Sequence, residues 1–367
     1  MKNQMREDLK TLLAAGETPR LSIALAADPT TTRAQGEYRN LLRAIETQAH
    51  AGDALAPLLA RARALAHDAA FWQQPGRGVA IYIEAQAQRT YHLPYAVTER
   101  ALVGPDYLLT PLLPLLAADQ PCAILALSQG AVKLLRGTRT AISEVSLPAS
   151  VPTSLEAALR SDEYERERRY SAVPTPTGRQ RGAIYYSHGI GSDEHEGELR
   201  RYCQQIDAGV CEVLTPATTP LILAGGKELT GIYRSVASYP NVLAQGIDGN
   251  PDVLSAAALG ERARPLMAAL ENADRQASIA RFRALIGTGR ASTDPGDIVR
   301  AAGEGRVDTL IVAAALATTV QPDRAVAPEE AQANRALLDT LRNRGAVVEA
   351  EPGEFPGDQA IVAIYRY

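Results

Sequence analysis

The alternation of apolar and polar side chains divides the chain into short strands and amphipathic helices. Apolar residues that recur every three to four positions predict helices, and short apolar runs between turn residues predict buried strands. In the first part of the chain this pattern predicts a charged N-terminal helix ending at Gly16, a strand over 21–26, helices over 32–50 and 53–69, strands over 79–84 and 90–93, and a short helix over 112–118.

The pattern changes at Gln120-Pro121. Apolar runs over 123–127 and 131–135 are separated by Ser128-Gln129-Gly130, and a small glycine-containing turn between two such runs predicts a β-hairpin. A third strand over 141–147 extends it.

A short helix through Arg160 is expected next. Thr153 or Ser154 is placed to cap its N-terminus, and Glu156 is placed for a capping box.

A polar segment rich in glycine and proline follows over 161–197. A loop of this length inside a compact domain is usually functional. After this loop the pattern predicts helices over 194–214, 227–236, 254–286 (broken near Pro265), 296–303 and 328–343. It predicts strands over 221–224, 309–313, 346–349 and 360–365, so that strands and helices alternate.

These elements predict an α/β protein with three domains. An N-terminal α/β domain is expected over 1–118, a middle domain containing the long loop over 119–275, and a C-terminal α/β sandwich over 276–367.

Composition narrows the classes of function. The chain has 367 residues, of which 46% are hydrophobic, and a formal net charge of −4, which argues against a nonspecific DNA-binding protein. Its three cysteines lack the spacing of a zinc site, so reduced thiols and no cofactor are expected. The charged N-terminus is unlike a signal peptide and no apolar run is long enough to span a bilayer, so a cytoplasmic protein is expected.

The long loop holds most of the candidate chemistry. His188 and His195 share it with Asp193, and imidazole and carboxylate groups suit metal binding or acid–base catalysis. The alternative is a solvated loop in which Asp193 is the N-cap of the next helix. No further histidine or cysteine stands at zinc spacing, so no metal is expected.

Two other motifs invite interpretation. Gly225-Gly226-Lys227 lacks the spacing of a phosphate-binding loop and predicts a tight strand-to-helix turn. Arg179 and Arg181 have no acidic neighbours in the long loop, and we expect them to contact phosphates.

Several segments, in order, resemble the archaeo-eukaryotic peptide release factor superfamily and its bacterial branch. PCAILALSQGAVKLLRGTRTAISEVSLP and PLILAGGKELTGIYR resemble the beginning and end of the middle, RNase H-like domain of release factors and Pelota. IARFRALIGTGRASTDPGDIVRAAGEGRVDTLIVA resembles the entry to their L7Ae-like third domain, and YPNVLAQGIDGNPDVLS with SHGIG resembles the bacterial branch.

The resemblance implies a specific chemistry for the loop. Release factors insert a Gly-Gly-Gln loop into the peptidyl transferase centre, where catalysis is largely the positioning of water on the peptidyl-tRNA ester. In register with that loop, this chain carries His188, Gly189 and Gly191, but Asp193 stands where the glutamine would be. If the loop is catalytic, Gln180 or Asp193 is expected to position the water.

Three hypotheses follow. The first is a ribosome-associated factor that binds the ribosome or tRNA and hydrolyses peptidyl-tRNA, with a translational GTPase as a further partner. The second is a non-catalytic relative that binds the ribosome or RNA with a degenerate loop. The third is a small-molecule hydrolase that uses His188, Asp193 and His195. None of them involves DNA or a membrane.

Overall fold

A computed structural model describes most of the chain, and the chain forms two compact units. The first unit combines Met1–Ala118 with Asn272–Tyr367, and the second is Asp119–Glu271. The described residues are 10–14, 18–27, 33–48, 55–74, 76–117, 121–138, 141–160, 191–314, 316, 326–351, 353–354 and 360–367.

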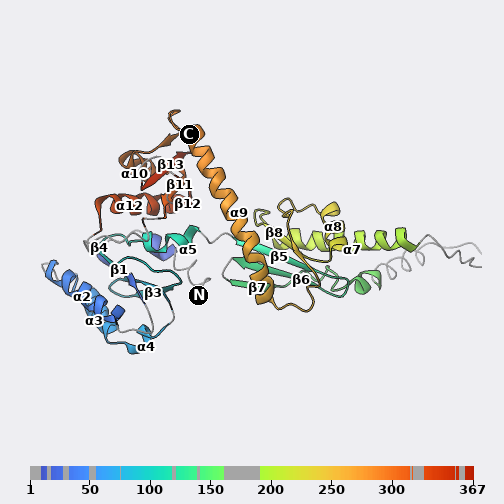
Figure 1. Cartoon of the computed structure of the whole chain (residues 1–367), viewed down its shortest axis with the longest axis horizontal. Helices are drawn as coiled ribbons and strands as arrows, with labels where there is room; N and C mark the ends of the chain where they lie inside the picture. Colours follow the sequence, from blue (N-terminus) through green and yellow to red (C-terminus); the bar gives the residue numbers. More distant parts are fainter. Residues whose placement is uncertain are drawn as a thin grey trace, which may run out of the picture. The chain divides into compact units, whose positions relative to one another are not determined.

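The second unit is built on a five-stranded mixed sheet with the order β7-β6-β5-β8-β9. β5, β6 and β7 form an antiparallel meander, and β8 and β9 continue the sheet parallel to β5 (Figure 1). The strands are β5 (Pro121–Leu127), β6 (Val132–Thr138), β7 (Ala141–Val145), β8 (Leu221–Gly225) and β9 (Ile247–Asp248).

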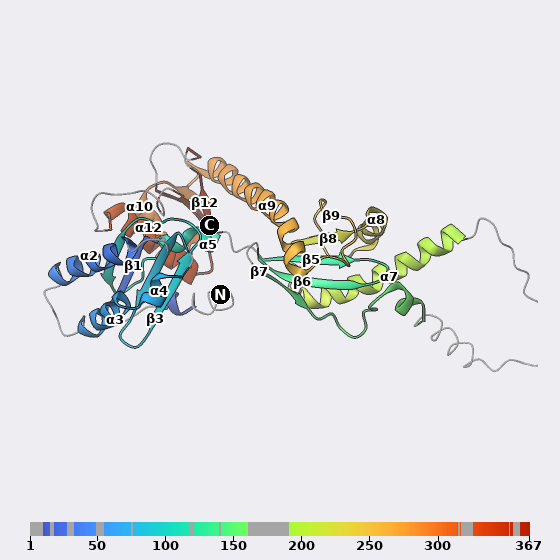
Figure 2. The ribbon, with the colours of Figure 1, turned by 60° about the horizontal axis from the view of Figure 1, so that its bottom comes forward.

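Both faces of this sheet are covered, which explains the unbroken apolar run of β5. Ala123, Leu125 and Leu127 pack with α7 (Gly191–Val213) and α8 (Lys227–Val236). The alternate residues, such as Ile124, pack against the first half of α9 (Ala256–Leu285) (Figure 2). A central strand buried on both sides is continuously hydrophobic rather than alternating.

Helix α9 is unbroken, and the predicted break at Pro265 is wrong. A proline inside a helix removes one backbone hydrogen bond and costs about 3 kcal/mol. Here Leu259, Ala263 and Met267 are buried on either side of Pro265, so packing holds the helix together through the proline.

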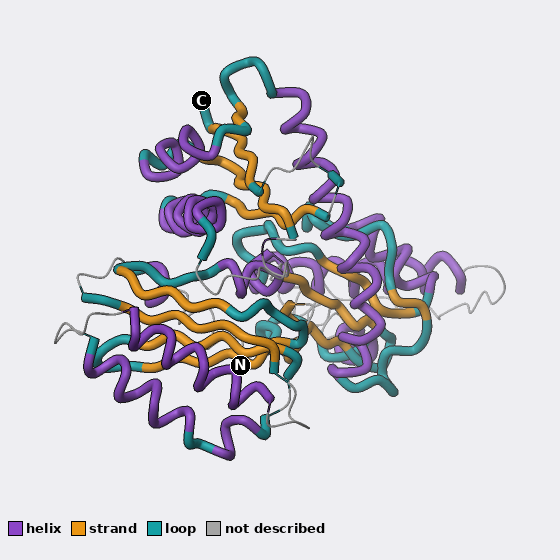
Figure 3. Tube along the Cα trace, turned by 60° about the vertical axis from the view of Figure 1, so that its left-hand side comes forward, coloured by secondary structure: helices purple, strands orange, loops and turns teal. Residues whose placement is uncertain are grey.

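The first unit contains two four-stranded sheets. One is antiparallel, with the order β3-β2-β1-β4. The helices α2 (Arg33–Gln48) and α3 (Ala56–Ala66) cover one of its two faces (Figure 3). Its strands are β1 (Arg20–Ala26), β2 (Gly78–Ile83), β3 (Gln88–Leu93) and β4 (Arg100–Gly104), and the short elements α4 (Ala69–Trp72), η1 (Thr110–Leu112) and α5 (Leu113–Ala117) complete this part.

The other sheet of this unit has the order β10-β13-β11-β12. The helices α10 and α12 pack with buried residues of β11 and β13, and the second half of α9 contributes Ile279 and Phe282 to a separate cluster with the same sheet. The elements are β10 (Ala291–Ser292), α10 (Pro295–Gly303), β11 (Val307–Ala313), α12 (Pro328–Arg342), β12 (Ala346–Ala350) and β13 (Ile361–Tyr365).

One hydrophobic cluster joins the two sheets of the first unit. It contains Tyr82 and Leu93 of the first sheet together with Leu310 of the second and Leu337 of α12. The regions predicted as N-terminal and C-terminal domains therefore lie in one compact unit, while each of the three predicted regions has its own sheet. The division into three domains stays a prediction.

Buried polar contacts from α12 reinforce this cluster. Glu330 is 1% exposed, forms an ion pair with the buried Arg100, and accepts a hydrogen bond of 2.8 Å from the Thr110 hydroxyl. Asn334 accepts from the Leu109 N–H at 2.7 Å and donates to the Tyr107 carbonyl at 2.9 Å. Hydrogen bonds and an ion pair thus connect residues more than 200 positions apart in sequence, and buried polar groups are normally accommodated by such partners.

Most predicted elements of the middle region are confirmed, including the hairpin of β5 and β6 and the bounds of α8. Of the two predicted caps, Ser154 is the one that forms, since its hydroxyl accepts from the Ala157 N–H at 3.2 Å. The capping box is wrong: Glu156 instead forms an ion pair with Arg160 at 2.6 Å. β4 was not predicted, because its sequence RALVG is short and half-buried.

Among the described residues, no helix combines the length and the apolarity that crossing a bilayer requires.

Candidate functional site

The two segments that lead into and out of the predicted loop rest on one hydrophobic core. The entering segment, residues 155–160, is helical, and its Leu155 and Ala158 are buried in the same cluster as Leu199 and Tyr202 of α7. The Leu155 N–H also donates to the Gln129 carbonyl at 2.9 Å in the β5–β6 turn. The base of the loop is therefore fixed to the sheet at both ends.

Most of the predicted site residues lie outside the described residues: Arg179, Gln180, Arg181, His188 and Gly189. Gly191 is the first residue of α7, and Asp193 lies inside its first turn. The interpretation of Asp193 as the N-cap is wrong, because α7 begins at Gly191, three residues before the start at 194 that the sequence pattern predicts.

The first turns of α7 carry an exposed charged surface. His195 lies 3.6 Å from the Glu198 carboxylate (Nδ1 to Oε2), and the two side chains are 48% and 36% exposed. Glu196 pairs with Arg200 at 3.2 Å. Within the part of the chain that the structure describes, no group of His, Cys, Asp and Glu side chains is placed to hold a metal ion.

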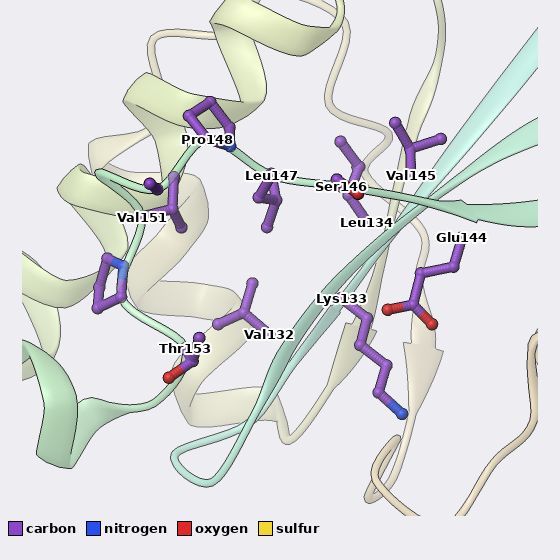
Figure 4. Close-up of a pocket in the computed structure, with 12 residues that line it drawn as sticks. Val132, Lys133, Leu134, Glu144, Val145, Ser146, Leu147, Pro148, Val151 and Thr153 are labelled. Atoms are coloured by element: carbon purple, nitrogen blue, oxygen red, sulfur yellow. The ribbon is translucent and has the colours of Figure 1, made fainter.

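A cavity of about 250 Å³ opens beside the base of the loop (Figure 4). It lies between the β6–β7 strands and the segment 146–153, and its walls are largely apolar. Lys133 and Glu144 supply its charged side chains (Figure 4). Val151, another lining residue, packs closely on α7, since a Cβ placed on Gly209 would lie 2.1 Å from its Cγ2 atom.

The turn at the carboxyl end of β5 is organised by Ser128. Its hydroxyl accepts from the N–H groups of Gly130 at 3.0 Å and Ala131 at 2.8 Å, and donates to the Asp252 carboxylate at 2.8 Å. The Tyr202 hydroxyl donates to the Ser128 carbonyl at 2.8 Å. This serine therefore stabilises a hairpin turn, in agreement with the absence of a serine-hydrolase motif around it.

A buried carboxylate, Asp207 of α7, was not singled out from the sequence. It is 3% exposed and accepts from the Tyr233 hydroxyl at 3.0 Å, the Ser238 N–H at 2.7 Å and the Ser238 hydroxyl at 2.6 Å. Burial, and then the negative charge of Asp207, raise the pKa of Tyr233. The cluster connects α7 to α8 and the segment after it; in the sequence Asp207 looks like an ordinary polar position of an amphipathic helix.

The Gly225-Gly226-Lys227 segment is confirmed as a tight strand-to-helix turn. A Cβ on Gly225 would lie 2.5 Å from the Leu127 carbonyl oxygen, so only glycine permits this approach of β8 to β5. Lys227 is exposed and lies 3.5 Å from the Asp248 carboxylate.

The cysteines are reduced thiols, as predicted. Cys122 and Cys203 are buried, Cys211 is half-buried, and none of these three described residues forms a disulfide. Burial raises the pKa of the Cys203 thiol to about 12, which keeps it protonated and unreactive.

Residues 121–306 match the family described as Bacterial archaeo-eukaryotic release factor family 3. The match spans more than half of the 367 residues and includes the loop with both of its flanking segments. The chain belongs to this family. The resemblance to the bacterial branch of the release factor superfamily is thereby confirmed.

This release factor family member is also similar to several solved structures. An archaeal translation termination factor, aRF1, is 12% identical, over 100% of this chain and 98% of that one, with a TM-score of 0.27. Ribosome-bound archaeal Pelota is 11% identical over 98% and 94%, with a TM-score of 0.43, and Dom34 from S. cerevisiae is 12% identical over 76% and 73%, with a TM-score of 0.37. A search of curated proteins finds no match.

Proposed function

We propose that this protein is a release-factor-like factor that acts on ribosomes and contacts ribosomal RNA or tRNA. The observation that carries the proposal is the family match over residues 121–306, which contains the predicted loop. The fixed base of this loop supports it, because a loop that must reach into RNA needs a rigid platform. The mixed sheet of the second unit is consistent with an RNase H-like middle domain, and an L7Ae-like C-terminal domain is part of the same proposal.

The proposed reaction is hydrolysis of the peptidyl-tRNA ester. Water attacks the ester carbonyl carbon, the bond from that carbon to the ribose oxygen breaks, and the products are the free peptide and a tRNA with its hydroxyl restored. Gln180 or Asp193 would hold the attacking water, Gly189 and Gly191 would let the backbone approach closely, and His188, Arg179 and Arg181 would contact the RNA. A translational GTPase is the proposed delivery partner.

A non-catalytic factor is the second candidate, and one observation favours it. Ser192 and Asp193 occupy the positions of the second glycine and the glutamine of the Gly-Gly-Gln loop. In that case the same surfaces bind the ribosome without releasing peptide.

Release of labelled peptide from stalled ribosome–nascent-chain complexes distinguishes the two candidates. The proteins to compare are the wild type, Gln180→Ala, Asp193→Ala and, as a matched control on the same helix, Glu196→Ala. Catalysis predicts release that one of the first two substitutions lowers by at least about tenfold, as expected when a group that positions water is removed, while Glu196→Ala retains it. No release by the wild type, despite binding, would contradict catalysis and leave the non-catalytic factor.

A further inference from the structure

Four arginines converge at one edge of the sheet β10-β13-β11-β12. Arg290, Arg306 and Arg344 precede β10, β11 and β12, and Arg366 follows β13. β12 runs parallel to β11 while β13 runs antiparallel to both β10 and β11, so these four positions lie at the same edge. Backbone hydrogen bonds fix the neighbourhood: the Tyr365 N–H donates to the Arg290 carbonyl at 2.8 Å, and the Arg366 N–H donates to the Arg306 carbonyl at 2.9 Å.

The side chains of Arg366 and Arg290 donate to neutral carbonyl groups at this edge. Arg366 donates from Nη2 to the Asn343 carbonyl at 2.7 Å, next to Arg344, and Arg290 donates to the Arg366 carbonyl at 3.4 Å. Each guanidinium has five N–H donors, so most of them are left to face solvent.

The positive charge at this edge is largely uncompensated. Arg306 pairs with Glu304 at 3.1 Å and stacks on the Tyr365 ring at 5.4 Å. Arg290, Arg344 and Arg366 are exposed, and the ion pairs of the described residues include none of these three. A concentration of like charge in a chain whose net charge is −4 costs stability, and it attracts anions.

Arg344 shows that this charge is placed at a cost to the backbone. Its φ is +58°, in the left-handed region just after α12, where glycine or asparagine is the usual residue. A residue with a Cβ costs roughly 1–2 kcal/mol in this conformation. The backbone gains nothing from arginine here, and the side chain is exposed.

We propose that Arg290, Arg344 and Arg366, named here the arginine edge, bind the phosphate backbone of a structured RNA. Guanidinium groups bind phosphates through paired N–H donors and remain charged at every physiological pH. Tyr367, which follows Arg366 in the sequence, is 73% exposed, and an exposed aromatic residue among arginines can stack on an unpaired base. The site lies in the unit that does not carry the predicted loop, so it is an RNA contact additional to that of the loop.

Fluorescence anisotropy with a labelled RNA hairpin in 50–200 mM KCl tests the arginine edge directly. The test variant combines Arg290→Gln, Arg344→Asn and Arg366→Gln; asparagine tolerates the left-handed backbone. The control combines Arg33→Gln, Arg63→Gln and Arg264→Gln, three exposed arginines that already pair with carboxylates. Both triple variants lower the net charge by the same amount.

We expect the logarithm of the wild-type association constant for the hairpin to fall steeply as the logarithm of the salt concentration rises. The arginine-edge variant should reduce that slope by about 2–3, since each lost phosphate contact removes about 0.7–0.9. The control should keep the slope within about 1. Equal loss in both triple variants, no loss in either, or competition by polyglutamate as effective as by RNA would overturn the proposal; the last would indicate an acidic protein partner.

Two features keep this test independent of the ribosomal proposal. It uses purified RNA, so binding at the arginine edge stands or falls whether or not the protein acts on ribosomes. Trp72, the single tryptophan, lies in the same unit, and its unfolding transition in urea should be the same in both triple variants, which excludes misfolding as the cause of lost binding.

Discussion

Gly209 of α7 lies where an added side chain would clash with a neighbouring segment. A Cβ there would lie 2.1 Å from the Val151 Cγ2 atom, so the segment that lines the cavity could not keep its place on the helix. We expect Gly209→Ala to destabilise the second unit by about 1–3 kcal/mol through overpacking. The cost of overpacking should exceed the stabilisation of about 1 kcal/mol that replacing glycine by alanine brings within a helix.

The same helix offers a matched control for Gly209. A Cβ added to Gly197 would meet nothing within 4 Å, so Gly197→Ala should leave stability unchanged or raise it by up to about 1 kcal/mol. Thermal unfolding followed by circular dichroism measures both variants. A Gly209→Ala protein as stable as Gly197→Ala would contradict the close packing, and Val151→Ala in the same chain should restore part of the loss.

Glu349 on β12 predicts a pH dependence of the first unit. Burial raises its pKa to about 7, and the charge of Glu351 acts in the same direction, whereas Arg275 lowers it. The folded protein holds this proton more tightly than the unfolded chain does. The stability contributed by protonated Glu349 is therefore present below about pH 4.5 and is lost as the pH rises through 7.

Glu349→Gln should remove that loss. Its free energy of unfolding, measured in urea by Trp72 fluorescence, should match the wild type near pH 4.5 and exceed it at pH 8 by about 1–3 kcal/mol. The control Glu329→Gln changes an exposed carboxylate and should give the same difference at both pH values. An effect of Glu349→Gln that does not vary with pH would contradict the burial of this carboxylate.

At the scale of elements, α12 holds the first unit together through Glu330. Its carboxylate is buried against Arg100 and Thr110, two residues of the first part of the chain. Glu330→Ala leaves the buried arginine without this carboxylate, and removing one partner of a buried ion pair costs about 3–5 kcal/mol. The exposed neighbour Glu329, changed to alanine, should cost less than about 0.5 kcal/mol.

Trp72 fluorescence in urea is the measurement for this helix as well. Trp72 lies in the part of the chain that precedes α12. A lower unfolding midpoint of Trp72 in Glu330→Ala therefore means that this part and α12 unfold together. The contrary result would be a Glu330→Ala protein whose Trp72 midpoint equals that of the wild type while circular dichroism shows a second transition at lower urea concentration. The two sheets would then unfold independently, and the shared core would not be cooperative.

The sequence predicts those helices and strands that are determined by residues close together in the chain. The hairpin of β5 and β6 has a Gly-containing turn between two apolar runs, and α8 follows a glycine pair with a strongly amphipathic pattern, so both were predictable. Pro265 misleads, because packing on both sides of the proline decides whether α9 continues. Asp207 could not be singled out, since its partners Tyr233 and Ser238 reach it only through the fold.

At the scale of the whole molecule, pairing between distant segments is what local patterns miss. The contacts of Asn334 with Leu109 and of Glu330 with Thr110 form only in the folded chain, and no spacing in the sequence predicts them. The candidate loop shows the opposite case: its residues were found from a resemblance in the sequence, and the structure adds the fixed base on which the loop stands.

Both candidate functions require that this release factor family member acts on ribosomes. Cosedimentation of the purified protein with bacterial ribosomes through a sucrose cushion, in a series of salt concentrations, tests it most directly. We expect binding at low salt that weakens steeply as salt rises, because contacts to RNA phosphates displace counterions. A protein that stays in the supernatant at every salt concentration, while folded by circular dichroism, would contradict the catalytic and the non-catalytic candidate alike.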